Sequence, residues 1–419
     1  MKVRFESWTR RQFVTRTAMA SLLADFSARA VLGMTPSAIS PFTTPAKNMG
    51  IYAGLGVRPL INAAGTYTML SGSTMPREVA AAMEEASRQH VSILELQEAV
   101  GKRIAALVGS EAAMVTAGCA AALTVATASC VSGADPDKIR RVPESSGMKN
   151  EVIFQKSHRF GYDHAIRNVG VKIVEVETRQ EMEGAINERT ALLFFLNLAD
   201  PQGQIKRQEF VEIAKKAGIP SLIDAAADLP PAENLTAFVK MGFDLVAFSG
   251  GKGLRGPQCS GLLLGRKDLI QAALLNGSPY SDTVARPSKV GKEEIIGLLT
   301  AVELYLKRDH QAEWAEWERR VQFIADGLRG IKTVQTERFV PEIANRVPHL
   351  AVKWDATTLR LRRENFEKAL REGEPRIETR PGVAEEGRLE IGVWMMQPDE
   401  HRIVARRCAE ILKKAAQSA

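Results

Sequence analysis

The chain has 419 residues, of which 45% are hydrophobic and 25% charged, and its formal net charge is +7. This composition is ordinary for a globular protein of two or three domains, or of one large α/β domain with an appendage, and no apolar run reaches the roughly 18 to 20 residues of a membrane span. This positive charge is too small to indicate a nucleic-acid partner by itself, and we expect none. It is equally compatible with an anionic small-molecule substrate. Four cysteines show neither a CxxC pair nor metal-ligand spacing, so neither a metal site nor a disulfide framework is expected.

Residues 1–33 have the pattern of an export signal. Arg10 and Arg11, then Phe13 and an apolar run of small residues resemble the bacterial twin-arginine signal, and residues 28–30 (Ala-Arg-Ala) fit a small-x-small cleavage site. The alternative is a basic amphipathic helix that stays in place, since charged residues interrupt the apolar run. We expect export to the periplasm, and a cytoplasmic protein if the signal does not function. Residues 34–50, rich in Pro, Thr and Ser, are predicted to be a linker.

The central part of the chain alternates helical and strand-like segments. Helical periodicity runs from Pro76 to Leu107, and further helices are predicted over 209–217 and 232–241. Between and after them lie short apolar runs with the character of strands: AAMVT, EVIFQ, VKIVEV, ALLFFLN, IPSLID, LVAFS and GLLLG. This alternation predicts βαβ units and a mostly parallel sheet, whose ligands gather at the carboxyl ends of the strands.

The last third of the chain has a different pattern. A charged helical region over about 290–330 leads to strand-like HLAVKW and RLEIGVW, with helices predicted over 363–371 and 400–414. We therefore predict an α/β fold with a large domain over 51–290, linking helices over 291–330 and a small α+β domain over 331–419.

The ends of two predicted strands carry groups suited to binding an anion or a ring. Gly118, Cys119 and Ala120 lie where a strand turns into a helix, and free N–H groups there suit a phosphate, although small residues at a helix start are also ordinary packing. His158 follows EVIFQ and could stack on an aromatic ring or transfer protons. The alternative for His158 is a loop histidine bonded to the backbone.

Two further strand ends carry a carboxylate and an amine. Asp224 ends the buried run SLID, where a carboxylate needs a cationic partner; a protonated pyridine nitrogen would serve, as would a nearby arginine, and a helix N-cap is also possible. Lys252 follows LVAFS in the stretch SGGKG, a setting that can desolvate a lysine and favour an imine with an aldehyde. The flanking glycines would let a phosphate-bearing ring lie against the backbone, and Ser249 could donate to the phosphate.

These four groups together indicate pyridoxal 5′-phosphate in a fold-type I enzyme. They are the phosphate-binding turn at residues 118–120, the ring-stacking His158, Asp224 and Lys252. The stretches RPLINAAGTYTMLSGSTMPREV, ILELQEAVGKRIAALVGSEAAMVTAGCAAA and FSGGKGLRGPQCSG resemble motifs of the bacterial selenocysteine synthase (seryl-tRNA selenium transferase) family. The stretch PQGQIKRQEFVEIAKKAGIPSLIDAAADLPP is similar to the D-glucosaminate-6-phosphate ammonia-lyase-type members. The likeness covers about residues 52–310 well.

The resemblance implies an aspartate aminotransferase-like fold and a role for each site residue. It makes Lys252 the Schiff-base lysine and Asp224 the pyridinium partner, puts His158 near the ring, and places Gly118, Cys119 and Ser249 around the phosphate. It also implies a homodimer or larger assembly. Two departures argue against tRNA chemistry: the phosphate segment is not asparagine-rich, and the chain has no room for the large tRNA-binding domain.

The predicted reaction is an α,β-elimination. Lys252 would remove the α-proton of an amino acid, a β-hydroxyl would leave, and hydrolysis would give ammonia and a 2-oxo acid. Transamination or racemisation would use the same residues, and a non-catalytic binding protein that kept the fold is the competing class. Arg380, Arg286 and Arg255 are candidates for the substrate carboxylate, because guanidinium groups bind carboxylates bidentately; the alternative for each is a solvated or structural arginine.

Overall fold

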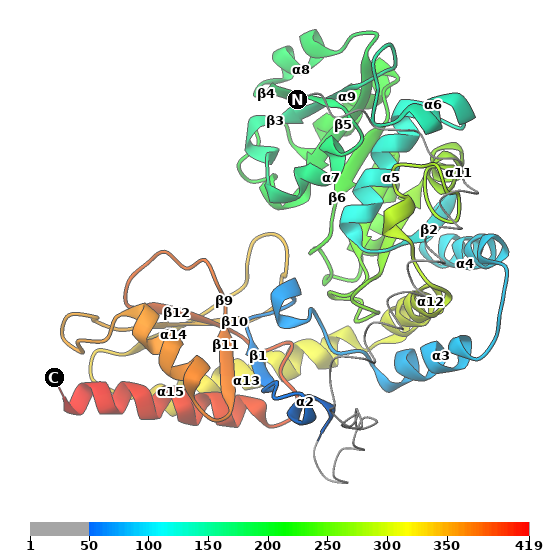
Figure 1. The fold of residues 1–419 in the computed structure, drawn as a ribbon. Helices are drawn as coiled ribbons and strands as arrows, with labels where there is room; N and C mark the ends of the chain where they lie inside the picture. Colours follow the sequence, from blue (N-terminus) through cyan, green and yellow to red (C-terminus); the bar gives the residue numbers. More distant parts are fainter. Residues whose placement is uncertain (1–49, 419) are drawn as a thin grey trace, which may run out of the picture. The chain divides into compact units, whose positions relative to one another are not determined.

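A computed structural model describes residues 50–418 of the chain (Figure 1). The chain divides into two units, with the boundary between Arg58 and Pro59. In the described part of the first unit, α2 (Ile51–Gly54) is the one helix. The predicted export signal and the predicted linker up to residue 49 lie outside the described residues. Within residues 50–418, no helix combines the length and apolar character that crossing a membrane requires.

The second unit contains a sheet of seven strands in the order β2-β8-β7-β6-β5-β3-β4. The strands are β2 (Ala112–Thr116), β3 (Glu151–Gln155), β4 (Lys172–Val176), β5 (Thr190–Leu196), β6 (Ser221–Asp224), β7 (Leu245–Ser249) and β8 (Gly261–Gly265). Strands β3 to β7 pair in parallel, whereas β8 runs antiparallel to both β7 and β2. The predicted α/β class with a mostly parallel sheet is confirmed. The exception, β8, follows β7 through a loop without a helix, a connection that only antiparallel neighbours allow.

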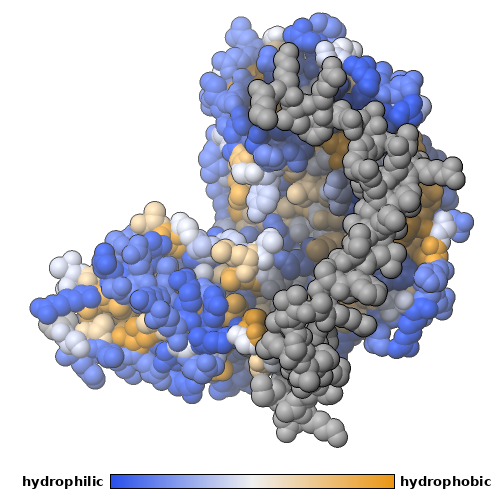
Figure 2. All heavy atoms as spheres, viewed as in Figure 1, coloured by the Kyte–Doolittle hydropathy of each residue, from blue (hydrophilic) through white to orange (hydrophobic). Residues whose placement is uncertain are grey.

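Helices cover both faces of this sheet, which explains its nearly continuous apolar strands. They are α3 (Arg77–Ser87), α4 (Ile93–Val108), α5 (Cys119–Ser132), α6 (Pro136–Arg141), α7 (His164–Arg167), α8 (Arg179–Ala185), α9 (Arg207–Ala217), α10 (Asn234–Met241), α11 (Lys267–Leu275) and α12 (Lys292–Lys307). In β5, Phe195 joins one core with Phe210, and Phe194 joins a second core with Leu123 of α5. Successive side chains of a strand point to opposite faces, so both faces of β5 are buried. Figure 2 shows a largely hydrophilic exterior, with apolar residues visible in a hollow beside the large sheet.

Two predicted long helical regions are each divided by a capped break. Residues 76–107 form α3 and α4, and the Ser92 hydroxyl accepts the Glu95 N–H at the start of α4. The region 290–330 forms α12 and α13 (His310–Leu328), and Asp309 caps the second helix by accepting the Ala312 N–H at 2.9 Å. A side-chain cap satisfies an otherwise unpaired helical N–H, so each cap lets a new helix begin in a new direction.

The C-terminal region forms its own sheets and core. An antiparallel sheet has the order β12-β10-β9, and β1 pairs in parallel with β11. These strands are β1 (Leu60–Ala63), β9 (Gln335–Phe339), β10 (His349–Lys353), β11 (Arg376–Thr379) and β12 (Arg388–Gly392), and α14 (Arg363–Glu372) and α15 (Glu400–Gln417) pack on them with α13. Strand β1 therefore joins the C-terminal strands, although it precedes the large sheet in the sequence. Short 3-10 helices complete the unit: η1 (Thr68–Leu70), η2 (Lys156–His158), η3 (Gly161–Asp163), η4 (Asn197–Ala199) and η5 (Arg286–Ser288).

A buried glutamine closes the open edge of β2. The Gln97 side chain donates to the Val115 carbonyl at 2.7 Å and accepts the Val115 N–H at 3.1 Å. The amide thus replaces the neighbouring strand that the last strand of a sheet lacks. Gln155 binds the backbone of Ile205 in the same bidentate way, at 2.7 and 2.9 Å.

We expect Gln97→Ala to lower the free energy of unfolding by about 2 to 4 kcal/mol, because it leaves two buried backbone groups of Val115 unsatisfied. Urea unfolding followed by far-UV circular dichroism measures this change. Gln208→Ala on the exposed face of α9 is the matched control, with an expected change within about 0.5 kcal/mol. Equal losses in the two variants would show that the Gln97 contacts do not stabilise the edge.

Candidate active site

Polar residues are concentrated at the carboxyl edge of the large sheet. Asn197 follows β5, Asp224 ends β6, and Ser249 ends β7 with Lys252 three residues later. Burial raises the pKa of the Asp224 carboxyl, and the charge of Lys252 lowers it in opposition. Burial likewise raises the pKa of the Cys119 thiol, against an opposing effect of Lys252. The fold therefore brings Cys119, Asp224 and Lys252 into mutual electrostatic range, at the edge where ligands of such sheets bind.

The two oxygens of Asp224 have different surroundings. The residue is 6% exposed, and its Oδ1 accepts the Ala226 N–H at 2.9 Å. The Cys119 Sγ lies 3.6 Å from the same Oδ1, and because its pKa lies well above the usual range the thiol stays protonated and donates. Two protein donors thus orient Oδ1, and Oδ2 is the oxygen available to an external cation such as a protonated ring nitrogen.

The start of α5 provides unpaired backbone N–H groups. Gly118 caps this 14-residue helix with a φ of 111°, and its carbonyl accepts the N–H of Ala122. The N–H groups of Cys119 and Ala120 precede that first helical bond, as a phosphate site requires. Gly261 of β8 packs directly on this turn, where a Cβ would lie 2.7 Å from the Cys119 nitrogen. Sequence reasoning missed Gly261, because nothing local predicts that β8 pairs with β2.

The glycines around Lys252 have a different purpose from the one expected. A Cβ on Gly251 would lie 2.6 Å from the Gln258 Cα, and a Cβ on Gly253 would collide with the Leu229 carbonyl. The loop folds back on itself through hydrogen bonds from Gly256 N–H to the Gly250 carbonyl at 2.8 Å and from Arg255 N–H to the Lys252 carbonyl at 2.9 Å. The space beside these two glycines is filled by the protein itself, so they serve backbone packing rather than approach of a ring.

His158 lies inside the protein between β3 and β5. It is fully buried, its Nδ1 accepts the Leu196 N–H at 3.1 Å, and its Nε2 is 3.2 Å from the Gln155 amide nitrogen. Its ring meets Phe195 edge to face at 4.4 Å. Burial lowers the pKa of His158 to about 4, so the imidazole is neutral. These are the surroundings of a backbone-bonded histidine, and they leave no exposed ring face for stacking.

A second buried carboxylate, Asp228, was not singled out from the sequence. It is 3% exposed, and burial together with the Asp224 charge raises its pKa to about 6. The Asn197 side chain and the Ala344 N–H face the carboxylate and lower its pKa in opposition, and Arg207 in turn donates to the Asn197 Oδ1 at 3.3 Å. The one local signal for it is the repeated aspartate in DAAAD at a strand end.

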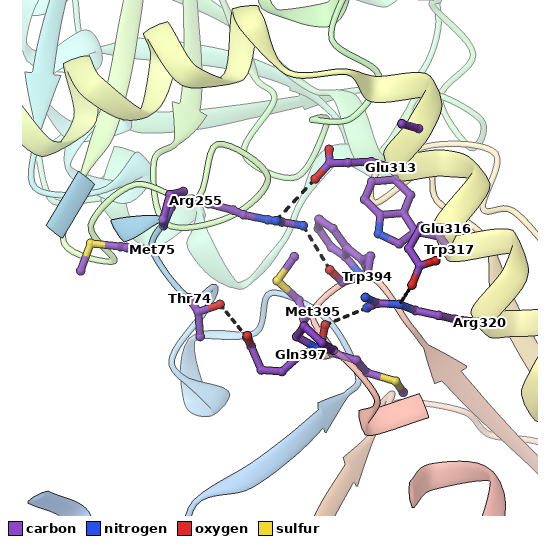
Figure 3. Close-up of a pocket in the computed structure, with 14 residues that line it drawn as sticks. Thr74, Met75, Arg255, Glu313, Glu316, Trp317, Arg320, Trp394, Met395 and Gln397 are labelled. Carbon is purple, nitrogen blue, oxygen red and sulfur yellow. Dashed lines mark hydrogen bonds and ion pairs between the residues drawn. The ribbon is translucent and has the colours of Figure 1, made fainter. Parts of the chain in front are cut away.

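The three arginines proposed for the substrate carboxylate have different environments. Arg255 donates to the Trp394 carbonyl at 3.3 Å and pairs with Glu313 at 3.5 Å, in a cavity of about 500 Å³ whose lining includes neither Lys252 nor Asp224 (Figure 3). Arg380 pairs with Glu390 at 3.1 Å. Arg286 is half-buried in η5. Two of the three guanidinium groups thus already have a carboxylate partner.

Nothing in residues 50–418 forms a group of three or more His, Cys, Asp and Glu side chains that could hold a metal ion. The cysteines Cys119, Cys130, Cys259 and Cys408 are free thiols. The residues at the sheet edge instead suit an organic cofactor with an anionic group, a cationic ring nitrogen and a carbonyl. The helix start, the Asp224 Oδ2 and Lys252 fit these three requirements of pyridoxal phosphate in turn.

Known proteins resemble this chain over most of its length. The family model described as L-seryl-tRNA selenium transferase (SelA) matches residues 60–353. D-Glucosaminate-6-phosphate ammonia lyase of Salmonella typhimurium is 31% identical over 377 residues, which cover 87% of this chain and 99% of that protein. A 5′-C-glycyluridine monooxygenase-decarboxylase of a Streptomyces species is 32% identical over 374 residues, covering 86% and 92%.

Solved structures agree with the sequence relatives. A structure of D-glucosaminate-6-phosphate ammonia-lyase superimposes with a TM-score of 0.77 at 30% identity, covering 88% of this chain and 100% of the other. Serine palmitoyltransferase of Sphingomonas wittichii superimposes with a TM-score of 0.54 at 16% identity, covering 96% and 98%, and shows the shared fold alone. The predicted fold-type I architecture is therefore confirmed.

We expect the stability of the cofactor-free protein to depend on Asp228 in a pH-dependent way. The folded state keeps the Asp228 proton up to about pH 6, whereas an ordinary aspartate loses it near 3.8. The folded state therefore binds more protons between these values, so stability falls as pH rises from about 4 to 6 and stays lower above. Asp228→Asn removes this effect and is expected to gain up to about 3 kcal/mol relative to wild type between pH 4 and pH 7.5.

Thermal unfolding of both proteins across this pH range measures the difference. Asp282→Asn, at an exposed position, is the control and is expected to show the same small difference at every pH. A constant offset between Asp228→Asn and wild type would contradict the raised pKa.

Proposed function

The chain belongs to the L-seryl-tRNA selenium transferase (SelA) family, and on this basis we propose that it is a pyridoxal 5′-phosphate-dependent lyase that releases ammonia from a β-hydroxy amino acid or an amino sugar acid. One observation carries the proposal. Lys252 and Asp224, whose Oδ1 alone accepts hydrogen bonds from the protein, lie at the same edge of the sheet as the unpaired N–H groups at the start of α5. A 31% identical relative with full-length coverage, named D-glucosaminate-6-phosphate ammonia lyase, supports the choice of reaction.

Each of these groups has a defined task in that reaction. When bound, pyridoxal phosphate supplies an electron sink for the substrate's α-carbon. The α5 N–H groups and Ser249 would bind its phosphate, and the Asp224 Oδ2 would hold the proton on its ring nitrogen. Cys119 and Ala226 keep Asp224 oriented through Oδ1. Lys252 takes the α-proton of the substrate at its Nζ atom.

The elimination balances without an added reactant. The bond from the α-carbon to hydrogen and the bond from the β-carbon to the hydroxyl break, and water leaves. Water then returns as the carbon–nitrogen bond is hydrolysed, so the net products are one 2-oxo acid and one ammonia for each amino acid. Transamination and racemisation use the same α-proton transfer, but neither releases ammonia.

Oxidative decarboxylation is a second reaction that the assay must test beside elimination. The relative of 32% identity is named a monooxygenase-decarboxylase, and an enzyme of that kind would consume oxygen and release carbon dioxide. Oxygen uptake and carbon dioxide release therefore belong in the same assay as ammonia release.

We expect the purified protein to bind pyridoxal phosphate and to release ammonia and a 2-oxo acid from D-glucosaminate, its 6-phosphate or another β-hydroxy amino acid. Lys252→Ala is expected to lose activity by at least about 1000-fold, since it removes both the cofactor's covalent attachment and the proton acceptor. An ammonia assay and a 2-oxo acid assay measure the reaction. Borohydride reduction followed by peptide mass spectrometry locates the attachment.

Lys289→Ala, at an exposed lysine, is the matched control and is expected to keep full activity. A wild-type protein that takes up no pyridoxal phosphate would support a non-catalytic binding protein instead. Amino-group transfer or racemisation without ammonia would assign the site to those reactions.

We further propose that the chain forms a homodimer or larger assembly and is exported to the periplasm. Exposed Met69, Val91 and Leu94 supply apolar surface for contact with a second copy, which sedimentation analysis can detect. For export, replacing Arg10 and Arg11 by Lys is expected to leave the protein in the cytoplasm, because the twin-arginine route requires the arginine pair.

Cell fractionation and immunoblotting measure the location of this variant. The same fractions, probed for a cytoplasmic marker, control for lysis. Equal periplasmic amounts of wild type and variant would reject the twin-arginine route. A cytoplasmic wild type would leave a phosphorylated sugar acid available as substrate, whereas an exported enzyme points to an unphosphorylated one.

A further inference from the structure

The loop of residues 342–348, between β9 and β10, extends from the C-terminal sheet to the edge of the large sheet. Its Asn345 N–H donates to the Ala227 carbonyl at 2.7 Å, and the Ala344 N–H faces the Asp228 carboxylate, whose pKa it lowers against the effect of burial. Ala227 and Asp228 lie three and four residues after Asp224. The loop is therefore fastened directly beside the residues that carry the proposed chemistry.

The backbone of this loop is strained where it is fastened. Ala344 has a φ of 54° and Asn345 a φ of 44°, both in the left-handed region that side chains with a Cβ disfavour. Alanine has no polar side chain to compensate, and Ala344 is buried. The Val347 N–H closes the turn on the Asn345 carbonyl at 2.7 Å. Strain of this kind persists where the surroundings impose it, and it is frequent at ligand sites.

Arg346 is the residue that this turn presents. It is exposed, and among residues 50–418 the structure shows no hydrogen bond or ion pair to its guanidinium. Other arginines nearby are engaged: Arg207 pairs with Asp200 at 3.2 Å, and Arg380 with Glu390 at 3.1 Å. The backbone beside Arg346 is thus anchored at the sheet edge, while its guanidinium is free to bind an anion.

The backbone anchor places Arg346 close to the residues that follow Asp224. Consecutive Cα atoms are about 3.8 Å apart, so the Arg346 Cα lies within roughly 8 Å of the Ala227 oxygen that anchors Asn345. The arginine side chain is long, so its guanidinium can extend further along this edge from that anchor. The edge also carries two carboxylates, Asp224 and Asp228, that repel an anion. A second cation beside Lys252 offsets this repulsion.

We infer that Arg346 binds an anionic oxygen group of the substrate, either the carboxylate of the amino acid or a phosphate on its far end. The inference rests on the proposed function, because it assigns the substrate of that same site. A planar guanidinium presents paired N–H groups that match both kinds of anion. A role in substrate binding would also explain why the 342–348 loop is held in a strained conformation beside Asp224.

Steady-state kinetics of wild type, Arg346→Lys and Arg346→Ala with D-glucosaminate and its 6-phosphate test this assignment. We expect Arg346→Ala to raise KM on the order of 10- to 100-fold with kcat changed less than about threefold, and Arg346→Lys to restore part of the loss. Arg406→Ala, at an exposed arginine on α15, is the control and is expected to leave KM unchanged. A loss confined to the phosphate ester identifies the phosphate as the group bound, and an equal loss for both compounds identifies the carboxylate.

A binding measurement separates this inference from the proposed reaction. Equilibrium dialysis of radiolabelled D-glucosaminate and its 6-phosphate against the cofactor-loaded proteins reports the Arg346 contact even when no ammonia is released. An unchanged melting temperature of Arg346→Ala establishes that the variant is folded. KM or Kd values within twofold of wild type for both compounds would overturn the inference, as would a wild-type protein that binds neither compound.

Discussion

The structure depends on how the buried carboxylate of Asp224 is stabilised at the end of β6. Removing a carboxylate from water costs several kcal/mol, and the pKa of Asp224 is raised accordingly. One oxygen receives two donors from the protein, the Ala226 N–H and the Cys119 thiol. The other is left for a cation. We propose a ring nitrogen as this cation, because Lys252 and the start of α5 lie at the same edge of the sheet.

The layered fold explains why the functional groups lie at this edge. Both faces of the large sheet are buried under helices, as the continuous apolar run of β5 requires. The strand ends and the loops beside them, unlike the buried faces, can offer polar groups to a ligand. The same burial also affects residues that do not meet the ligand, since it makes His158 a neutral histidine held by the Leu196 N–H.

Segments far apart in the sequence complete the edge. Gly261 of β8 packs on Gly118 because β8 runs between β7 and β2. The 342–348 loop comes from the C-terminal sheet, binds Ala227 and faces Asp228. The large sheet thus carries the groups that we propose for the cofactor, while the C-terminal region carries an arginine on a strained turn. Related chains of this family carry names of different reactions. Separate origins suit such a family, because the groups from the C-terminal region can change without disturbing those of the large sheet.

Local patterns along the chain predict the α/β class, the alternation of strands and helices, and the four strand ends with Gly118, His158, Asp224 and Lys252. These follow from local periodicity and from residues that are costly to bury, which are properties of short segments. Contacts across the fold, in contrast, establish that Cys119 donates to Asp224, that His158 packs against Phe195, and that the glycines beside Lys252 pack on Gln258 and Leu229. They also establish the antiparallel β8, the pairing of β1 with β11, and the raised pKa of Asp228. Each of these depends on contacts between residues distant in the chain, and no local pattern specifies which distant partner a side chain will meet.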